Sequence, residues 1–483
     1  MRQVHSDRAS YDGSKAADRR AGTRFALFQG VLLQGVWLAC CLWAYAAVVR
    51  AFGYEGFAVV TPVDVSRLIA VFVSLIGLSL MLPSRLASPA DYVVIALFDI
   101  SFVPFSAYWV LSNQPWWQGL LVAAYWGIVL LISRVPVRVQ RRYLRGAQST
   151  AFLVARCLVI LGAILILAGG HLTLRLPFSD VYTARYAWGS EGSGMSMYLF
   201  PWLANALLPV LMAHAWKNRR PLELLALVFT AYMLFTSTGM KAYLVMPALM
   251  MGVLVLARWR PSGSFVPFCL GVFASVMILL DRVTHGVFWT SLGLRRAIFV
   301  PARLTSVYME FFAGNPTIHL SDSLLLRGLL RYPYVRSVAH TIGAYLGQPS
   351  MGANNGLAAD GFANFGIMGV LVWAILLGLL LKLLRMATAS IEDQPESWAA
   401  ATMWPVILLS SALTTSLLTH GLALGLLFAF ALKPAAGRRA PGRRNGVMVN
   451  GGREPTAGDL TATSGRSGEG RSSEYSPSPG IQR

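Results

Sequence analysis

The sequence predicts an all-α, polytopic integral membrane protein. Of its 483 residues, 55% are hydrophobic and only 13% are charged, which is too little charge to cover a soluble protein of this length. The mean hydropathy is +0.56. Apolar runs also recur along the chain, and roughly 20 apolar residues in a helix cross a hydrocarbon core of about 30 Å. These observations exclude a soluble enzyme.

About twelve stretches are long and apolar enough to be transmembrane helices. The chain therefore divides into an N-terminal tail at 1–24, a polytopic membrane domain at 25–432 and a C-terminal tail at 433–483. The C-terminal tail is rich in Gly, Ser, Pro and Arg, a composition typical of disorder. The predicted spans lie at 25–49, 65–82, 91–111, 116–133, 150–169, 195–216, 222–238, 241–257, 264–280, 362–384, 399–416 and 418–432.

Basic residues cluster at every second loop, and this alternation predicts the orientation of the chain. The formal net charge is +20, but the arginines stand in short loops beside apolar runs, where they act as topology signals rather than as a nucleic-acid surface. Clusters at 134–145, 217–220 and 258–260 are therefore expected in the cytoplasm together with both termini. One large loop, 281–361, is left on the outer face.

The first candidate site residues are arginines in this outer loop. The stretch 291–313 has the pattern of a helix, in which Arg296, Arg303 and Glu310 recur every seventh position and share one face, with Arg295 beside them. A guanidinium group stays charged at any pH and binds phosphate oxygens bidentately, so this face suits a pyrophosphate. The alternative is that these arginines contact lipid headgroups or pair with Glu310 and Asp322.

The second group of candidates lies just before the tenth predicted span. Asn354, Asn355, Asp360 and Asn364 place amide and carboxylate groups at the mouth of a membrane helix. Sugar hydroxyl groups need such an array of donors and acceptors. The alternative is a helix entry of the Asx type with close packing at the neighbouring glycines. A lone carboxylate such as Asp360 is costly at a membrane boundary unless it has a partner.

Two further candidates stand alone in the sequence. Lys241 follows a turn at the outer end of its predicted helix, where it either extends to the membrane interface or adds a cation to a phosphate site. His340 lies between the arginines and the Asn/Asp stretch and is a candidate base, although a lone histidine is more often structural. The histidines and cysteines lack metal-ligand spacing, so we expect no metal.

Three stretches carry a resemblance to a known family. They are FTSTGMKAYLVMPALMM, LRRAIFVPARLTSVYMEFFAGNP and GANNGLAADGFANFGIMGVLVWAILLGLLLKLL. In this order and spacing, over roughly 230–420, the chain resembles the oligosaccharide repeat-unit polymerases, the O-antigen polymerase group of bacterial inner membranes. Members commonly carry Ser-Arg or Gly-Ser-Arg where this chain has Thr238-Gly239-Met240-Lys241, so the role of Lys241 stays open.

The resemblance implies a multi-pass glycosyltransferase of the bacterial cytoplasmic (inner) membrane that needs no metal, nucleotide or other cofactor. It would transfer a growing glycan from undecaprenyl pyrophosphate to the next lipid-linked repeat unit on the outer face, making O-antigen, capsule or exopolysaccharide. The implied partners are the undecaprenyl-pyrophosphate-linked oligosaccharide, membrane lipid and a chain-length regulator, and no nucleic acid.

Under this reading the site residues divide by chemistry. Arginines stabilise the charge that develops on the leaving pyrophosphate. The acceptor hydroxyl group needs a base or an orienting hydrogen bond, and the candidates are Asp360, Glu310 and His340.

Two alternative functions stay open. An O-antigen ligase uses the same donor with a different acceptor, and no residue excludes it. A flippase or other transporter should place its polar residues among mid-membrane helices and often contains a repeat, whereas we find no repeat between the two halves of this chain.

Overall fold

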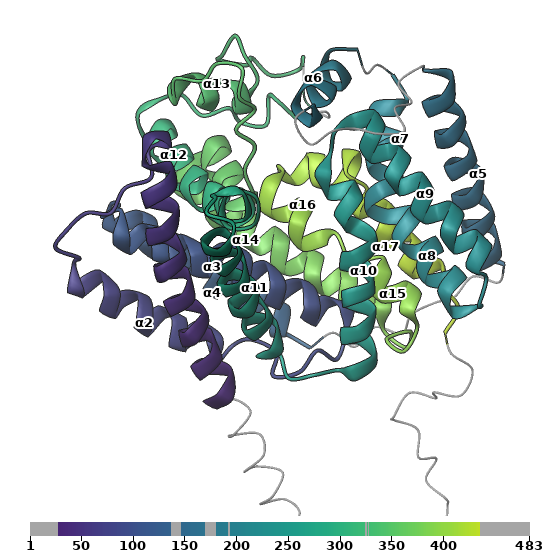
Figure 1. The fold of residues 1–483 in the computed structure, drawn as a ribbon, viewed down its shortest axis with the longest axis horizontal. Coiled ribbons are helices and arrows are strands. Elements are labelled where there is room, and N and C mark those ends of the chain that lie inside the picture. The colour runs from purple at the N-terminus through teal and green to yellow at the C-terminus, as the bar shows by residue number, and fades with distance from the viewer. Residues whose placement is uncertain are drawn as a thin grey trace, which may run out of the picture. The chain divides into compact units, whose positions relative to one another are not determined.

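The computed structural model describes residues 28–136, 146–169, 180–191, 194–323, 326 and 328–434. Within these ranges the protein is helical and has no β-strand, only an isolated bridge between Arg85 and Ser262. Figure 1 shows the helices. The predicted N-terminal tail at 1–24 and nearly all of the predicted C-terminal tail at 433–483 lie outside the described residues.

Nine helices of the described part are long and apolar enough to cross a membrane. Each coincides with a predicted span, and the other three predicted spans correspond to shorter helices: α2 (Val65–Ser79), α16 (Trp404–Ser410) with the π-helix η4 (Thr415–Thr419), and α17 (Leu422–Ala431). The nine long helices are Phe28–Glu55, Pro89–Leu111, Trp116–Arg134, Ala147–Ala168, Ser196–Lys217, Pro221–Thr238, Lys241–Trp259, Phe265–Val283 and Leu357–Thr388.

The helix α3 (Pro89–Leu111) forms the centre of one group of helices. It begins at a capping box in which Ser88 and Asp91 bond each other's backbone, and nearly all of its side chains are buried. The helices α4 (Trp116–Arg134), α12 (Val300–Gly314), α14 (Leu357–Thr388) and α16 pack against it. The apolar core therefore surrounds α3.

A second group of helices packs around α8 (Leu208–Lys217). It contains α9 (Pro221–Thr238), α10 (Lys241–Trp259), α5 (Ala147–Ala168) and the short α15 (Pro395–Ala399). The helix before α8 is α7 (Ser196–Trp202), joined to it by the π-helix η2 (Leu203–Leu207). Few side chains of α5 and α10 are buried, as expected for helices that face lipid.

The predicted outer loop 281–361 is itself largely helical. After α11 (Phe265–Val283) come the π-helix η3 (Thr290–Phe299), α12 and α13 (Val338–Tyr345). The predicted helix at 291–313 is confirmed, and Pro301 stands in the first turn of α12, directly after η3. In Figure 1, α13 and α6 (Val181–Glu191) lie at the top of the view.

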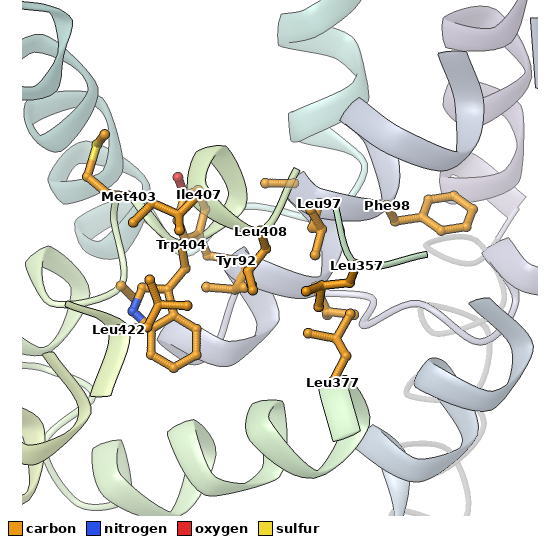
Figure 2. Close-up of a cluster of buried hydrophobic side chains, with 14 of the residues drawn as sticks. Tyr92, Leu97, Phe98, Leu357, Leu377, Met403, Trp404, Ile407, Leu408 and Leu422 are labelled. Atoms are coloured by element: carbon orange, nitrogen blue, oxygen red, sulfur yellow. The ribbon is translucent and has the colours of Figure 1, made fainter. Parts of the chain in front are cut away.

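Side chains of α3, α14 and α16 meet in one buried cluster, shown in Figure 2. Tyr92 of α3 also donates a hydrogen bond from its hydroxyl to the carbonyl of Thr402, at 3.0 Å. Lipid tails are as apolar as these side chains, so close packing and hydrogen bonds stabilise the cluster more than removal from water does. The cluster fixes the positions of α14 and α16, which carry the candidate site.

The helix α14 is not continuous. Phe365 (φ −143°, ψ 24°) and Gly366 (φ 61°, ψ −142°) leave the helical conformation, and the positive φ at Gly366 suits glycine. A Cβ atom on Gly361 would stand 2.7 Å from the carbonyl oxygen of Gly369, although eight residues of straight helix span about 12 Å. The chain therefore reverses, and the short limb (357–364) packs against the long limb (367–388).

Candidate functional site

A cavity of about 240 Å³ lies beside the short limb of α14. Its walls come from the short limb, the segment that links α16 to η4, the loop that follows α12 and the start of α13. Four residues predicted from the sequence line it, namely Asn354, Asn355, Asp360 and Asn364. Its other polar lining residues are Tyr308, Asp322, Ser323, Ser337, Ser411, Thr414, Thr415 and His420.

The carboxylate of Asp360 accepts three hydrogen bonds from neutral donors. Its Oδ1 accepts from Asn364 Nδ2 at 2.9 Å, and its Oδ2 accepts from Trp373 Nε1 at 2.7 Å and from the Leu413 amide at 2.9 Å. Within the described residues, Asp360 forms no ion pair. The carboxylate therefore joins the short limb, the long limb and the start of η4 without a cation.

The side chain of Asn364 is fully used inside the protein. Its Nδ2 donates to the Asp360 carbonyl at 2.8 Å as well as to the carboxylate, and its Oδ1 accepts from the Leu320 amide at 2.6 Å. The amides of Ile318 and His319 bond the last carbonyls of the short limb at 3.0 and 3.3 Å. Asn364 thus positions Asp360 and ties the loop to the helix end.

The two other asparagines differ in exposure. Asn355 is buried, and its Nδ2 donates to Thr305 Oγ1 of α12 at 3.3 Å, while its Oδ1 accepts from the Gly356 amide at 2.8 Å. Asn354 is exposed, and its side-chain amide forms no hydrogen bond with another described residue. Asn355 therefore anchors the short limb, and Asn354 is the asparagine that can meet a ligand.

A second broken helix completes the cavity, and sequence reasoning missed its residues. Ser411 is extended (φ −144°, ψ 147°) between α16 and η4, and Thr414 and Thr415 follow it on the cavity wall. The ring nitrogen Nδ1 of His420 is buried and has no hydrogen-bond partner among the described residues. The signal in the sequence was the run SSALTTSLLTH, an unusual density of hydroxyl groups in an apolar stretch.

The predicted arginines do not line this cavity. Arg295 is buried, pairs with Glu55, donates to Ser291 Oγ at 3.0 Å and lies 4.3 Å from the ring centre of Phe52. Arg303 is half-buried with its guanidinium 5.4 Å from the ring centre of Phe57. These two cations pack against the turn that ends the first helix, a structural use that differs from the pairing with Glu310 and Asp322 that the sequence left open.

Arg296 and Glu310 are exposed, whereas Arg303 between them is half-buried, so the three do not share one environment. The π-helical turns of η3 hold more residues than α-helical turns, and a seven-residue spacing across η3 and α12 therefore does not follow one face. Glu310 accepts a hydrogen bond from the Tyr345 hydroxyl at 2.8 Å.

The remaining two candidates also lie off the cavity wall. His340 is exposed, and its Nδ1 lies 2.9 Å from the hydroxyl of Ser337, which is a wall residue. Lys241 begins α10 directly after a turn that touches α6, because a Cβ atom on Gly239 would stand 2.8 Å from the Arg185 amide. Lys241 takes part in interactions of its own.

The arrangement can bind hydroxyl groups and accept a proton. Its donors and acceptors are amides, hydroxyls, two carboxylates and one imidazole, and no Arg or Lys stands among the lining residues that the structure describes. Among the described residues, no group of three or more His, Cys, Asp and Glu is placed to hold a metal ion. No family model, curated protein or solved structure matches this chain.

Proposed function

We propose that this chain is a glycosyltransferase that polymerises undecaprenyl-pyrophosphate-linked oligosaccharide repeat units on the outer face of the bacterial cytoplasmic membrane. The observation that carries the proposal is the cavity of about 240 Å³ that two broken helices line with hydroxyl, amide and carboxylate groups. Irregular backbone at membrane depth is tolerated where it lines a polar cavity. A neutral sugar needs this kind of lining.

In this proposal the cavity binds the acceptor sugar. The acceptor hydroxyl oxygen attacks the anomeric carbon of the donor glycan, the bond from that carbon to the pyrophosphate oxygen breaks, and undecaprenyl pyrophosphate leaves with the electron pair. The hydroxyl proton passes to a base. Asp360 is one candidate, and the unpartnered Nδ1 of His420 is the second, added by the geometry of the wall.

The leaving pyrophosphate is assigned to a position outside the cavity, because the described residues of the lining include two carboxylates and no Arg or Lys. Of the predicted arginines, Arg296 is the exposed one and is the remaining candidate. The proposed orientation keeps both termini in the cytoplasm and 281–361 on the outer face. A chain-length regulator is the proposed partner protein.

A direct test is to supply the purified, reconstituted protein with a lipid-linked repeat unit and to resolve the products by gel. A ladder of polymer supports the proposal, and unchanged single repeats under conditions that keep the protein folded contradict it. The surface glycan of a deletion strain gives an independent readout. One repeat per chain indicates a lost polymerase, and complete chains left on the lipid indicate a lost ligase.

A transporter is the second candidate function, and one observation favours it. Two interrupted helices beside a polar cavity are also the typical architecture of substrate sites in secondary transporters. Glycan retained on the cytoplasmic side in the deletion strain would select this alternative over the polymerase.

A further inference from the structure

A second and larger cavity lies in the second group of helices, away from the residues of the candidate site. It has a volume of about 780 Å³, within the range typical of ligand pockets. The end of α8, the start of α9, the end of α10 and the segment before α15 form its walls. Its lining residues are different from those of the Asp360 cavity.

Most of the charged side chains that line this cavity are basic. They are Lys217, Arg219, Arg220 and Arg258, against two carboxylates, Glu392 and Asp393, and we call this cavity the basic pocket. The surplus of positive charge favours an anionic ligand.

Several of these charges are already paired. Lys217 contacts Glu396 at 3.1 Å, Arg220 contacts Glu223 at 3.4 Å, and Asp393 contacts Arg260 at 2.5 Å. Arg219 and Arg258 are both exposed, and neither forms an ion pair with a residue that the structure describes. These two arginines are therefore the cations available to a ligand.

The backbone holds Arg219 in a defined place. It stands in the left-handed conformation (φ 53°), and the amides of Arg219 and Arg220 bond the carbonyls of Trp216 and Ala215 at 3.2 and 2.9 Å. Trp398 Nε1 donates to the Glu392 carbonyl at 2.8 Å and fixes the opposite wall. A fixed wall lowers the entropy lost on binding.

The rest of the lining is apolar and continues onto surface that faces lipid. Trp216, Leu224 and Leu254 line the pocket, and Trp216 is 54% exposed. Beside it, Leu222 is 81% exposed, as expected at the end of a membrane helix. A ligand with an anionic head and an apolar tail matches both parts of this surface.

We propose that the basic pocket binds the phosphate of an anionic phospholipid, with Arg219 and Arg258 at the headgroup and the acyl chains along α9 and α10. Basic pockets between membrane helices commonly bind such headgroups. The site needs neither the polymerase assignment nor the transporter alternative. It also gives the basic cluster at 217–220 a binding role in addition to its topological one.

The test measures thermal unfolding of the purified protein in detergent micelles that contain phosphatidylglycerol or phosphatidylcholine. Phosphatidylglycerol should raise the Tm by about 3 °C or more over phosphatidylcholine, because a ligand that binds only the folded state stabilises it. The Arg219→Ala/Arg258→Ala variant should lose at least half of this shift. The matched control, Arg85→Ala/Lys382→Ala, removes two cations outside the pocket and should keep it.

Two further arms make the result decisive. Glu392→Gln removes a carboxylate from the pocket wall, so the Tm shift with phosphatidylglycerol should increase. This variant tests the site by a gain of binding. Inorganic phosphate at the same concentration should give no shift in Tm. A shift equal to that of phosphatidylglycerol would show that the pocket binds a free anion rather than a lipid. Equal shifts with both lipids, or equal losses in the pocket and control variants, would overturn the proposal.

Discussion

Two carboxylates of the protein, Asp360 in the candidate site and Glu396 in α15, differ in the charge of their hydrogen-bond partners. Glu396 is buried and accepts hydrogen bonds from His214 at 3.0 Å and from Lys217 at 3.1 and 3.2 Å. Asp360 accepts three hydrogen bonds from neutral donors and has none from a cation. A carboxylate beside cations is stabilised in its charged form and resists protonation, whereas one held by neutral dipoles keeps more capacity to accept a proton.

This difference in hydrogen-bond partners distinguishes a carboxylate that stabilises the fold from one that is available for chemistry. Glu396 joins α15 to α8 through His214 and Lys217. Asp360 also joins three segments, but it opens on a cavity. We infer that the lack of a cation, rather than the carboxylate itself, marks Asp360 as the better candidate for chemistry.

We expect substitution of Asp360 to change polymer formation more than any other substitution. Asp360→Asn should lower polymer formation at least about 100-fold, because an amide is no base and would direct an N–H group at the donors that now bind the carboxylate. Asp360→Glu should keep weak activity. The measurement is polymer formed per folded protein in the reconstituted assay.

Asn354→Ala is the control for this experiment, since that amide lines the same cavity without supporting Asp360. It should weaken apparent acceptor affinity more than turnover. Full specific activity of Asp360→Asn would remove Asp360 from the list of candidate bases and leave His420.

The second prediction concerns the reversal that places Asp360. A Cβ atom on Gly369 would overlap the Gly361 carbonyl oxygen, which belongs to rigid backbone. Gly369→Ala should therefore destabilise the fold by about 3 kcal/mol, seen as a lower Tm and a lower yield of folded protein. Gly352→Ala is the matched control, because a Cβ atom there would meet no atom within 4 Å. Equal stability of the two variants would refute the close packing of the limbs.

The third prediction is that Arg295, like Glu396, stabilises the fold. Arg295→Ala leaves Glu55 without its partner in a largely buried position, so the unfolding free energy should fall by about 2 to 3 kcal/mol. The Glu55→Gln/Arg295→Ala double variant should recover part of the loss. The cycle is measured by thermal or denaturant unfolding.

Arg296→Ala, the exposed neighbour, is the comparison for this cycle. It should leave stability unchanged and reduce polymer formation if it meets the pyrophosphate. If Arg295→Ala has normal stability but forms no polymer, Arg295 contacts the substrate and is not a structural residue.

The smallest effect concerns the pH dependence of Glu396. Burial alone would raise its pKa, but the hydrogen bond from His214 and the charge of Lys217 outweigh burial and hold the pKa of Glu396 below its ordinary value. A lowered folded-state pKa contributes stability above the unfolded value of about 4.3, and this contribution is lost as pH falls through the folded value.

Glu396→Gln should therefore lower the unfolding free energy by about 1 to 2 kcal/mol at neutral pH, a modest value because Lys217 is 42% exposed. The difference in Tm between wild type and variant should shrink as pH falls below about 4.3. A difference that stays constant from neutral to acid pH would show that the negative charge of Glu396 is not what stabilises the contact.

The sequence alone determined the class of the protein and the positions of its helices. Hydrophobic runs report helix position because a span must be apolar over its whole length. Nine of the twelve predicted stretches coincide with described helices long and apolar enough to cross a membrane, and the other three contain shorter helices. Composition also pointed to the cluster of Asn354, Asn355, Asp360 and Asn364, which does line one cavity. These features depend on local composition, which the sequence states directly.

Only the tertiary structure decided how the polar residues group. The reversal at Phe365 and Gly366, the π-helical turns of η3 and the break at Ser411 change which side chains face each other, and none has a periodic signal in the sequence. Arg295 looked available for substrate because Glu55, its partner, lies 240 residues earlier in the chain. Long-range contacts of this kind depend on how helices pack, so the separation of the arginines from the Asp360 cavity follows from packing and not from local sequence.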